Sequence, residues 1–269
     1  NPFWTINKTP FSTDLNRLIG NVQLDYNIGG GFSALYRLGT DIYQDNRHQY
    51  YDLGSSTLSD GRIFYDRYTF TSLNSDLILA YSKKFSDNFK FDGKIGNNFY
   101  STELNEIYTQ GDGLVASDFD NMDNATVVKS SNFVTPYRRS AMYFDLNFDY
   151  ASLLFLEITG RNDWSSTLPP DKKSFFYPSA NLSFVFTQLN GLKGNILNYG
   201  KLRLSAAQVG KDAPAFALNG YYTKATFSDG YTSGITYPND GVAGFGRVTT
   251  LGNPDLKPEK TTSYEVGLN

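Results

Sequence analysis

Cysteine is absent from the 269 residues, and histidine occurs once, at His48. The first absence excludes a disulfide scaffold and thiolate metal sites, and a single imidazole leaves no partner for an HExxH motif. Glutamate is scarce, with five residues, and no pair of carboxylates has a spacing that indicates glycosidase chemistry. A GxSxG motif is also missing. We therefore expect neither a catalytic centre nor a cofactor.

Long apolar runs and basic clusters are missing as well. LLFL at 153–156 is among the longest apolar runs, far below the roughly 18 residues that indicate a transmembrane helix. The net charge is -3, and no run of lysine or arginine and no RNA-binding motif is present, which excludes nucleic acid as an expected partner. GFGR at 244–247 lacks the third glycine and the following helix of a nucleotide-binding fingerprint.

Aromatic residues are abundant, at 16% of the chain, with 20 Tyr and 21 Phe. The mean hydropathy is nevertheless polar, at -0.40. Strands with one apolar and one wet face explain this combination, and apolar and polar residues do alternate in the sequence. Between residues 17 and 28, for example, the even positions are mostly apolar and the odd positions mostly polar. About nine such segments are predicted as strands, at 17–28, 32–42, 77–81, 89–99, 142–150, 154–161, 180–187, 201–206 and 263–269.

The connections between these strands alternate between short and long. Short ones are predicted at 29–31, 83–88, 151–153 and 189–198, and long polar ones at 45–73, 102–136, 162–174 and 210–260. Outer-membrane barrels have short periplasmic turns and long extracellular loops, and their strands need about 9–11 residues to cross the bilayer. The fold class predicted is all-β, an antiparallel transmembrane β-barrel segment. A soluble sandwich or propeller is the alternative, but a 51-residue loop is hard to place in one.

Aromatic residues near the predicted strand ends indicate two interfacial girdles. The row beside the short turns is Tyr26, Phe32, Phe85 and Tyr150. The row beside the long loops is Tyr43, Phe99, Tyr100, Tyr137, Phe175 and Tyr177. Both rows are expected to lie on the lipid side of the strands.

Two polar loop features have a chemical and a purely structural interpretation. His48 is predicted to be a solvated residue of a long loop. Asp118, Asp120 and Asp123 in DFDNMDN resemble a calcium loop, but Met122 breaks the EF-hand pattern, and the glycine and distal glutamate are missing. An acidic surface loop is the favoured interpretation, and Ca²⁺ binding at 118–124 stays an open alternative.

Four stretches resemble the barrel of SusC/RagA-type TonB-dependent transporters of Bacteroidetes. They are NPFWTINKTPFSTDLNRLIGNVQLDY (1–26), LFLEITGRNDWSSTLPPDKKSFFYPSANLSFVF (154–186), YGKLRLSAAQVGKDAPAFA (199–217) and LGNPDLKPEKTTSYEVGLN (251–269). GRNDWSSTLP and NPDLKPE are the specific motifs. Residues 1–269 are therefore expected to form part of the barrel domain, without its plug, N-terminal extension and remaining strands. The last predicted strand stops without a terminal aromatic residue, which also suggests missing chain.

The resemblance implies a twenty-two-stranded barrel in the outer membrane of a Gram-negative bacterium of Bacteroidetes type. It implies import of a large nutrient of the glycan or peptide class, energised by the TonB complex through the missing plug region. A SusD-like surface lipoprotein and outer-membrane lipid are the expected partners. Catalysis and a metal are not implied.

The resemblance and the alternation together suggest residues that face the lumen, the plug or a substrate. These are Arg161, Asp163, Trp164, Arg203 and Glu259. By alternation Arg161 faces the lumen, where its planar guanidinium could bond plug or loop carbonyls. For Trp164, an interface anchor or loop-packing role is favoured over stacking on a sugar. For Glu259, which follows two prolines that end the loop, a structural clamp is favoured over substrate contact.

Two other functions stay open at this point. A SusC-like barrel could serve as a structural subunit of a larger outer-membrane assembly. A small complete barrel of adhesin type is the third possibility, but nine strands count against it because bacterial single-chain barrels close with even numbers.

Overall fold

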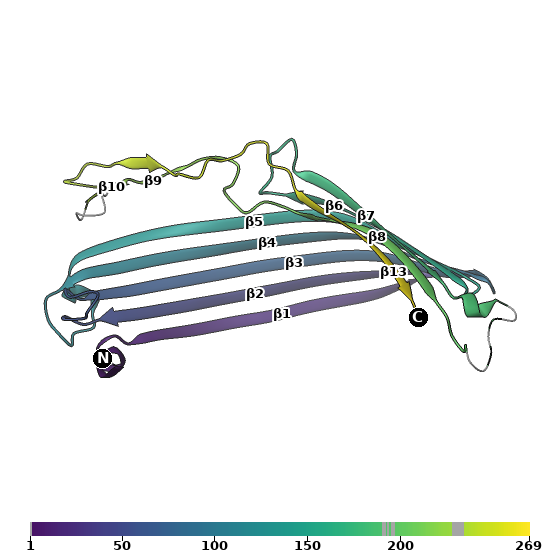
Figure 1. The fold of residues 1–269 in the computed structure, drawn as a ribbon, viewed down its shortest axis with the longest axis horizontal. Helices are drawn as coiled ribbons and strands as arrows, with labels where there is room; N and C mark the ends of the chain where they lie inside the picture. Colours follow the sequence, from purple (N-terminus) through teal and green to yellow (C-terminus); the bar gives the residue numbers. More distant parts are fainter. Residues whose placement is uncertain (1, 190–191, 193, 195–196, 228–233) are drawn as a thin grey trace. The chain divides into compact units, whose positions relative to one another are not determined.

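The computed structural model describes residues 2–189, 192, 194, 197–227 and 234–269. Nine long strands dominate it. They are β1 (Phe11–Gly29), β2 (Phe32–Tyr51), β3 (Arg62–Ser86), β4 (Phe89–Leu114), β5 (Ala125–Tyr150), β6 (Leu154–Ser165), β7 (Ser174–Phe184), β8 (Leu202–Lys211) and β13 (Glu259–Leu268). They form one sheet in the order β1-β2-β3-β4-β5-β6-β7-β8-β13 (Figure 1). The predicted all-β class and the nine strands are confirmed.

Shorter elements fill the connections. The helical ones are α1 (Pro2–Lys8), η1 (Met122–Asn124) and η2 (Phe186–Gln188). Among the described residues, none of the helices has both the length and the apolar character needed to cross a bilayer. The connection between β8 and β13 contains two small antiparallel sheets, made of β9 (Tyr222–Lys224) with β12 (Phe245–Arg247) and of β10 (Thr226–Phe227) with β11 (Ile235–Thr236).

The strand register confirms the two faces read from the sequence. Leu156 of β6 lies opposite Phe148 and Leu182, and Leu182 lies opposite Leu204, so apolar residues continue from strand to strand. One position along, Glu157 lies opposite Asn147 and Asn181. Because side chains alternate across a sheet, these two rows lie on opposite faces. We call them the apolar face and the polar face.

Tight turns form the short connections between strands, such as 30–31 and 151–153. Gly29, Gly30 and Gly31 all have positive φ, which glycine adopts without a steric penalty. Ala151 and Ser152 also have positive φ, at 55° and 53°, and the N–H of Leu153 donates to the carbonyl of Tyr150 at 2.9 Å. Two successive residues with positive φ are typical of the type I′ hairpin turn, whose twist matches that of the strands. The predicted short turns at 29–31 and 151–153 are confirmed.

The predicted bounds of the first two long loops are wrong. Residues 45–51 and 62–73 belong to β2 and β3, and residues 102–114 and 125–136 belong to β4 and β5. The connections are only 52–61 and 115–124, and β3, β4 and β5 have 25 or 26 residues. On the apolar face the residues become polar beyond Ile42, Leu73 and Phe99, although the strands continue. A strand surrounded by water on both faces loses the apolar alternation that the sequence prediction followed.

The aromatic row beside the short turns is confirmed, and most of the other row is not on the apolar face. Tyr26, Phe32, Phe85 and Tyr150 are exposed and lie within a few residues of the turns. In contrast, the ring of Tyr43 lies under the guanidinium of Arg17, and the hydroxyl of Tyr177 donates to Asp163. By alternation Tyr43, Tyr100, Tyr137, Phe175 and Tyr177 belong to the polar face, and only Phe99 belongs to the apolar face. The second girdle was therefore a wrong prediction.

The residues divide into two compact units. The first unit comprises 1–27, 34–78 and 98–138, and the second comprises 28–33, 79–97 and 139–269. The core of the first unit is small and consists of Tyr50, Ile63 and Leu114, with Leu53, Met122 and Ala125 packed against it. In the second unit the β7–β8 ladder ends at Ser179, next to Pro178, which has no N–H to donate.

The acidic loop and the histidine have partners within the first unit. Asp118 pairs with Lys8, and Oδ1 of Asp120 lies 3.0 Å from Nε2 of His48. In the part of the chain that the structure describes, no group of three or more potential ligands could hold a metal ion. His48 lies within β2, against the ring of Tyr65, so the prediction of a solvated loop histidine is wrong.

Candidate functional site

The polar face of the first unit contains ion pairs along neighbouring strands. Arg17 of β1 donates twice to Asp41 of β2, from Nε at 2.9 Å and from Nη2 at 2.7 Å. Arg47 donates from Nε to Asp45 at 2.9 Å, and the Thr13 hydroxyl donates to the same carboxylate at 2.8 Å. The two-point contact between Arg17 and Asp41 fixes the direction of that guanidinium more firmly than a single contact would.

Aromatic rings lie beside arginines on this face, including Arg47 and Arg62. The guanidinium carbon of Arg47 lies 4.6 Å from the ring centroid of Tyr68, and that of Arg62 lies 5.6 Å from Phe64. Cation–π contacts of this kind contribute about 0.5–2 kcal/mol each, depending on exposure. The rings of Phe64 and Tyr108 are 5.7 Å apart. We call this surface the arginine–aromatic wall. Its members are Arg17, Tyr43, Arg47, Arg62, Phe64, Tyr68, Phe70, Tyr100, Tyr108 and Tyr137.

Asp66 and Glu106 add negative charge to this wall. Burial raises the pKa of Asp66, and the nearby charge of Glu106 raises it further, while Arg47 lowers it. Oδ1 of Asp66 is buried and has no hydrogen-bond partner among the described residues. The wall therefore offers cationic, anionic and aromatic groups close together, which suits a ligand with hydroxyl, amide and charged groups.

This wall was not predicted from the sequence. The strands were predicted from the alternating apolar residues, which end near Ile42 and Leu73, and the residues beyond them were predicted to be loops. The polar face could have revealed the wall, because every second residue from 41 to 47 reads Asp, Tyr, Asp, Arg, and from 62 to 70 reads Arg, Phe, Asp, Tyr, Phe. A period of two thus persists on that face beyond the apolar segment.

Two of the predicted site residues, Arg161 and Asp163, meet on the polar face of the second unit. Nε of Arg161 donates to Oδ1 of Asp163 at 2.8 Å, and the Tyr177 hydroxyl donates to the other carboxylate oxygen. The guanidinium carbon of Arg161 is 5.6 Å from the ring centroid of Tyr143. Asp163 is only 1% exposed, so these two donors replace hydrogen bonds that its carboxylate would make with water. The arrangement links β5, β6 and β7 on the polar face.

The Ser165 hydroxyl of the GRNDWSST motif also forms side-chain hydrogen bonds. The Ser165 hydroxyl is within 3.0 Å of that of Thr167, and Ser165 donates to Asp212 at the start of the next long connection. Trp164 is half-buried and lies opposite Ser140 and Ser174, on the face away from Asp163. These contacts give the motif a structural function at the end of β6.

The second motif, NPDLKPE, contacts the residues just after the first motif through an ion pair. Lys172, in the connection after β6, lies 2.6 Å from Asp255. The N–H of Asp255 donates to the side chain of Asn253, and the N–H of Asn253 donates to the carbonyl of Ala217. The two stretches that are most specific in the sequence are therefore neighbours in the fold.

The remaining predicted residues lie on β8 and β13. Arg203 is exposed and lies opposite Gly267, where a Cβ would be 3.3 Å from its guanidinium nitrogens. Glu259 is the first residue of β13 and lies opposite Lys211. Neither residue contacts Arg161 or Asp163 in the described contacts.

Comparison with known proteins gives one consistent result. The family model described as TonB dependent receptor-like, beta-barrel matches residues 1–269. TonB-dependent receptor P26 of Formosa agariphila is 26% identical over 199 residues, which cover 72% of this chain and 19% of that protein. TonB-dependent receptor P3 of the same organism is 24% identical over 217 residues, 80% of this chain and 19% of that protein.

The fold has a solved counterpart in the RagAB peptide transporter. The TM-score is 0.86 at 16% sequence identity, and the alignment covers 99% of this chain and 29% of that chain. The chain thus spans less than a third of the proteins it matches. It belongs to the TonB-dependent receptor-like β-barrel family of the bacterial outer membrane.

Proposed function

We propose that the chain forms part of an importer that moves a large nutrient of the glycan or peptide class across the outer membrane. Energy is supplied through TonB by parts of the protein outside residues 1–269. A SusD-like surface lipoprotein delivers the substrate at the outer end. The observation that carries the proposal is the arginine–aromatic wall, which lies on the polar face, beyond the apolar segment of each strand.

The position of the wall supports contact with a substrate. An apolar face turned to lipid requires the opposite face of a barrel strand to look into the barrel. Tyr43, Tyr68 and Tyr108 are partly accessible on that face, and their hydroxyl and ring groups can contact sugar or peptide groups without a defined sequence or linkage. The wall therefore suits transient contacts during passage and does not require a single tight site.

A pocket lined by β7, β8 and β13 supports contact with the barrel interior in the second unit. Its volume is about 290 Å³, and polar-face residues Asn181, Arg203, Ser205 and Glu265 contribute to its lining. Gly267 leaves room for the Arg203 guanidinium. We propose that Arg203 contacts the plug or substrate there, and that Arg161 and Asp163 hold β5, β6 and β7 together beside the interior.

The experiment is an uptake assay with the full-length receptor in its own host. Cells grow on a defined glycan mixture or on casein-derived peptides as the sole carbon source, with the receptor gene intact, deleted, or carrying Arg47→Ala with Tyr68→Ala. The two substitutions should remove about 1–2 kcal/mol of contact free energy between the substrate and the wall. The uptake rate at limiting substrate should therefore fall about 5- to 30-fold. Outer-membrane levels of the receptor are measured in parallel by immunoblot.

The matched control is Tyr65→Ala with Arg67→Ala, which lie on the same strand as Tyr68 but on the other face. Uptake by this control should equal that of the wild type. Uptake that persists after deletion of the receptor gene or of TonB would refute import. Co-purification with secretion or barrel-assembly machinery, without a SusD-like partner, would favour the structural-subunit alternative.

A further inference from the structure

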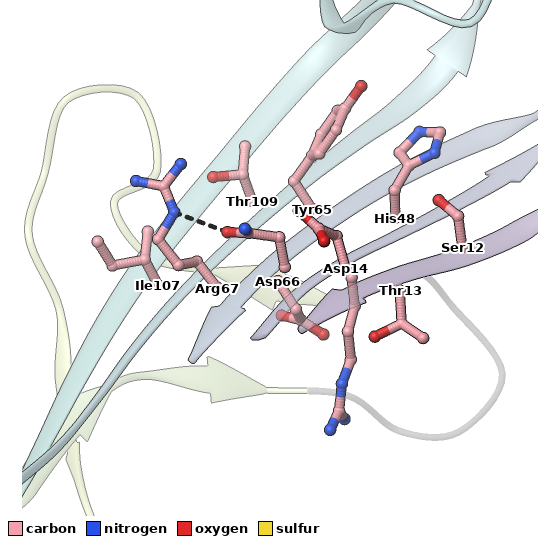
Figure 2. A pocket seen from close by; sticks show the side chains of 11 residues that line it. Ser12, Thr13, Asp14, His48, Tyr65, Asp66, Arg67, Ile107 and Thr109 are labelled. Carbon is pink, nitrogen blue, oxygen red and sulfur yellow. Dashed lines mark hydrogen bonds between the residues drawn. The ribbon is translucent and has the colours of Figure 1, made fainter. Parts of the chain in front are cut away.

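A pocket of about 500 Å³ lies on the apolar-face side of the first unit, beyond the apolar segment (Figure 2). Two residues from each of four consecutive strands line it: Ser12 and Asp14 of β1, Asn46 and His48 of β2, Tyr65 and Arg67 of β3, and Ile107 and Thr109 of β4. Thr13, Arg47 and Asp66, which lie between these pairs, also line it. The family motifs GRNDWSSTLP and NPDLKPE contain none of these residues, and the import proposal uses only Arg47 among them.

Alternation places this pocket on the same side of the sheet as lipid. Along β2, Asn46 and His48 continue the even-numbered positions of Tyr36, Leu38 and Ile42. The intervening Arg47 pairs with Asp45 on the polar face. In Figure 2 the side chains of His48 and Tyr65 extend to one side of the strands and those of Thr13 and Asp66 to the other. The pocket therefore opens on the opposite side of the sheet from the aromatic rings of the wall, and Arg47 is the member of the wall that also lines it.

The height of the pocket restricts what can occupy it. Asn46 is four residues beyond Ile42, and Tyr65 is eight residues beyond Leu73. At about 3.3 Å per residue and a strand tilt of about 40°, the pocket is roughly 10–20 Å above the edge of the apolar segment. Phospholipid head groups occupy only about 5–8 Å beyond the hydrocarbon core. The outer leaflet of an outer membrane also contains glycolipids, whose sugars extend to this height.

The lining groups match sugar hydroxyls better than phosphate. Arg67 lines the pocket, and its Nε donates to the side-chain oxygen of Asn46 at 3.1 Å. Asp14 supplies a carboxylate, so the positive charge of Arg67 is balanced, whereas phosphate sites gather cations. The rings of His48 and Tyr65, with centroids 4.5 Å apart, form an aromatic surface for the C–H face of a pyranose. Tyr65 is 43% exposed, so this surface is accessible.

We propose that this pocket binds the core saccharide of an outer-leaflet glycolipid, chiefly through its hydroxyl groups, and so fixes the receptor in its lipid surroundings. The pocket is continuous along each strand with the face that contacts the acyl chains of the same leaflet. One glycolipid molecule can therefore contact the apolar segment with its chains and the pocket with its sugars.

The test uses the full-length receptor in nanodiscs of phosphatidylethanolamine. The probe is deacylated core oligosaccharide prepared from the lipopolysaccharide of the host strain, titrated by calorimetry. Tyr65→Ala with Arg67→Ala should raise the Kd at least tenfold. The control, Tyr43→Ala with Tyr68→Ala, changes two residues of the wall on the opposite face of β2 and β3 that do not line the pocket, and it should leave the Kd unchanged. Heat-modifiable gel migration checks that both variants are folded.

A second variant keeps the test decisive if the double substitution fails to fold. Ile107→Trp adds volume at the pocket without removing a polar contact, and it should also raise the Kd at least tenfold. Equal affinity of wild type and pocket variants would overturn the proposal. So would loss of binding in the Tyr43/Tyr68 variant alone, because the saccharide would then occupy the import path. Competition by soluble phosphoethanolamine would identify a phospholipid site and overturn it as well. Import by the Tyr65/Arg67 variant, measured separately, should be normal.

Discussion

Asp52 joins three segments of the first unit at one buried carboxylate. It is fully buried and accepts hydrogen bonds from Lys8 Nζ at 2.9 Å, Tyr50 OH at 2.8 Å and Ser117 Oγ at 2.7 Å. The backbone N–H groups of Leu53 and Asp118 donate to it as well. Burial alone would raise the pKa of Asp52, but these donors outweigh burial and hold the pKa well below its ordinary value. Burial and Asp52 together raise the pKa of Tyr50 to about 12.

We expect Asp52→Asn to loosen the connections 52–61 and 115–124 and the N-terminal helix. Hydrogen bonds to a charged acceptor contribute about 1.5–3 kcal/mol net, so local stability should fall by about 2–3 kcal/mol. Hydrogen exchange of the Tyr50 and Asp52 amides, which donate to Pro10 and Lys8 carbonyls, should accelerate about 30- to 150-fold. Asp60→Asn, at an exposed position in the same connection, is the control and should change exchange little.

The pH dependence of this node has a defined sign. The folded-state pKa of Asp52 lies below the ordinary value of 3.8, so its stabilising contribution is complete above about pH 4. The contribution is lost as the pH falls from there toward the folded-state pKa. Exchange at the same amides should therefore rise more steeply below pH 4, after correction for intrinsic rates, in the wild type than in Asp52→Asn. Parallel profiles for the two proteins would contradict this assignment.

At the scale of the element, β6 shows how a glycine determines strand packing. Gly160 is buried, and a Cβ added there would lie 2.5 Å from Cε1 of Phe144 and 2.9 Å from Cζ of Phe176. The two rings from β5 and β7 thus cover the backbone of β6 on the apolar face. The glycine of GRNDW is required for this close approach, independently of the polar network that begins at Arg161.

Gly160→Ala should therefore destabilise the barrel by about 1–3 kcal/mol, the usual cost of adding volume to a packed site. The measurement is the urea midpoint of the full-length receptor in detergent, followed by tryptophan fluorescence. Gly20→Ala is the matched control, since no atom lies within 4 Å of a Cβ built at that position of β1. Equal midpoints for the two variants would show that the rings move aside at little cost.

At the scale of the whole molecule, the first five connections of the nine-stranded sheet alternate between short and longer. The β7–β8 connection at 185–201 is longer than the β6–β7 connection at 166–173, so the alternation ends there. Part of the predicted short connection at 189–198 lies outside the described residues. Residues 30–31, 87–88 and 151–153 are short connections, and 52–61, 115–124 and 212–258 are longer ones. In an outer-membrane barrel the longer ones face the cell exterior. The complete absence of cysteine from this chain makes the orientation directly testable.

Single cysteines at Ser59 and Asp87 should respond oppositely to a membrane-impermeant maleimide. Both positions are exposed, in a longer connection and in a tight turn respectively. In intact cells Ser59→Cys should be labelled almost fully and Asp87→Cys only at background, and permeabilised cells should label both. Any cysteine elsewhere in the full-length receptor is first replaced. Labelling of Asp87→Cys in intact cells would reverse the assigned orientation.

Much of the fold follows from local pattern. Residues 17–28 and 32–42 alternate with period two, Gly29 to Gly31 fix the turn between them, and the register confirms the faces of β5 to β8. These features are encoded locally, because lipid on one face and water on the other impose a strict alternation, and because positive φ favours glycine. The family motifs at 160–169 and 253–259 were also readable without a structure.

What the tertiary structure decided lies beyond the apolar segments. Strands β2 to β5 continue where water contacts both faces, so Tyr68 and Arg47 could be distinguished from loop residues only through their cross-strand partners. The same holds for Tyr43 and Tyr177, whose aromatic character alone indicated lipid but whose contacts with Arg17 and Asp163 place them on the polar face. Hydrophobicity reports the solvent of one face, whereas strand pairing depends on backbone hydrogen bonds that any side chain permits.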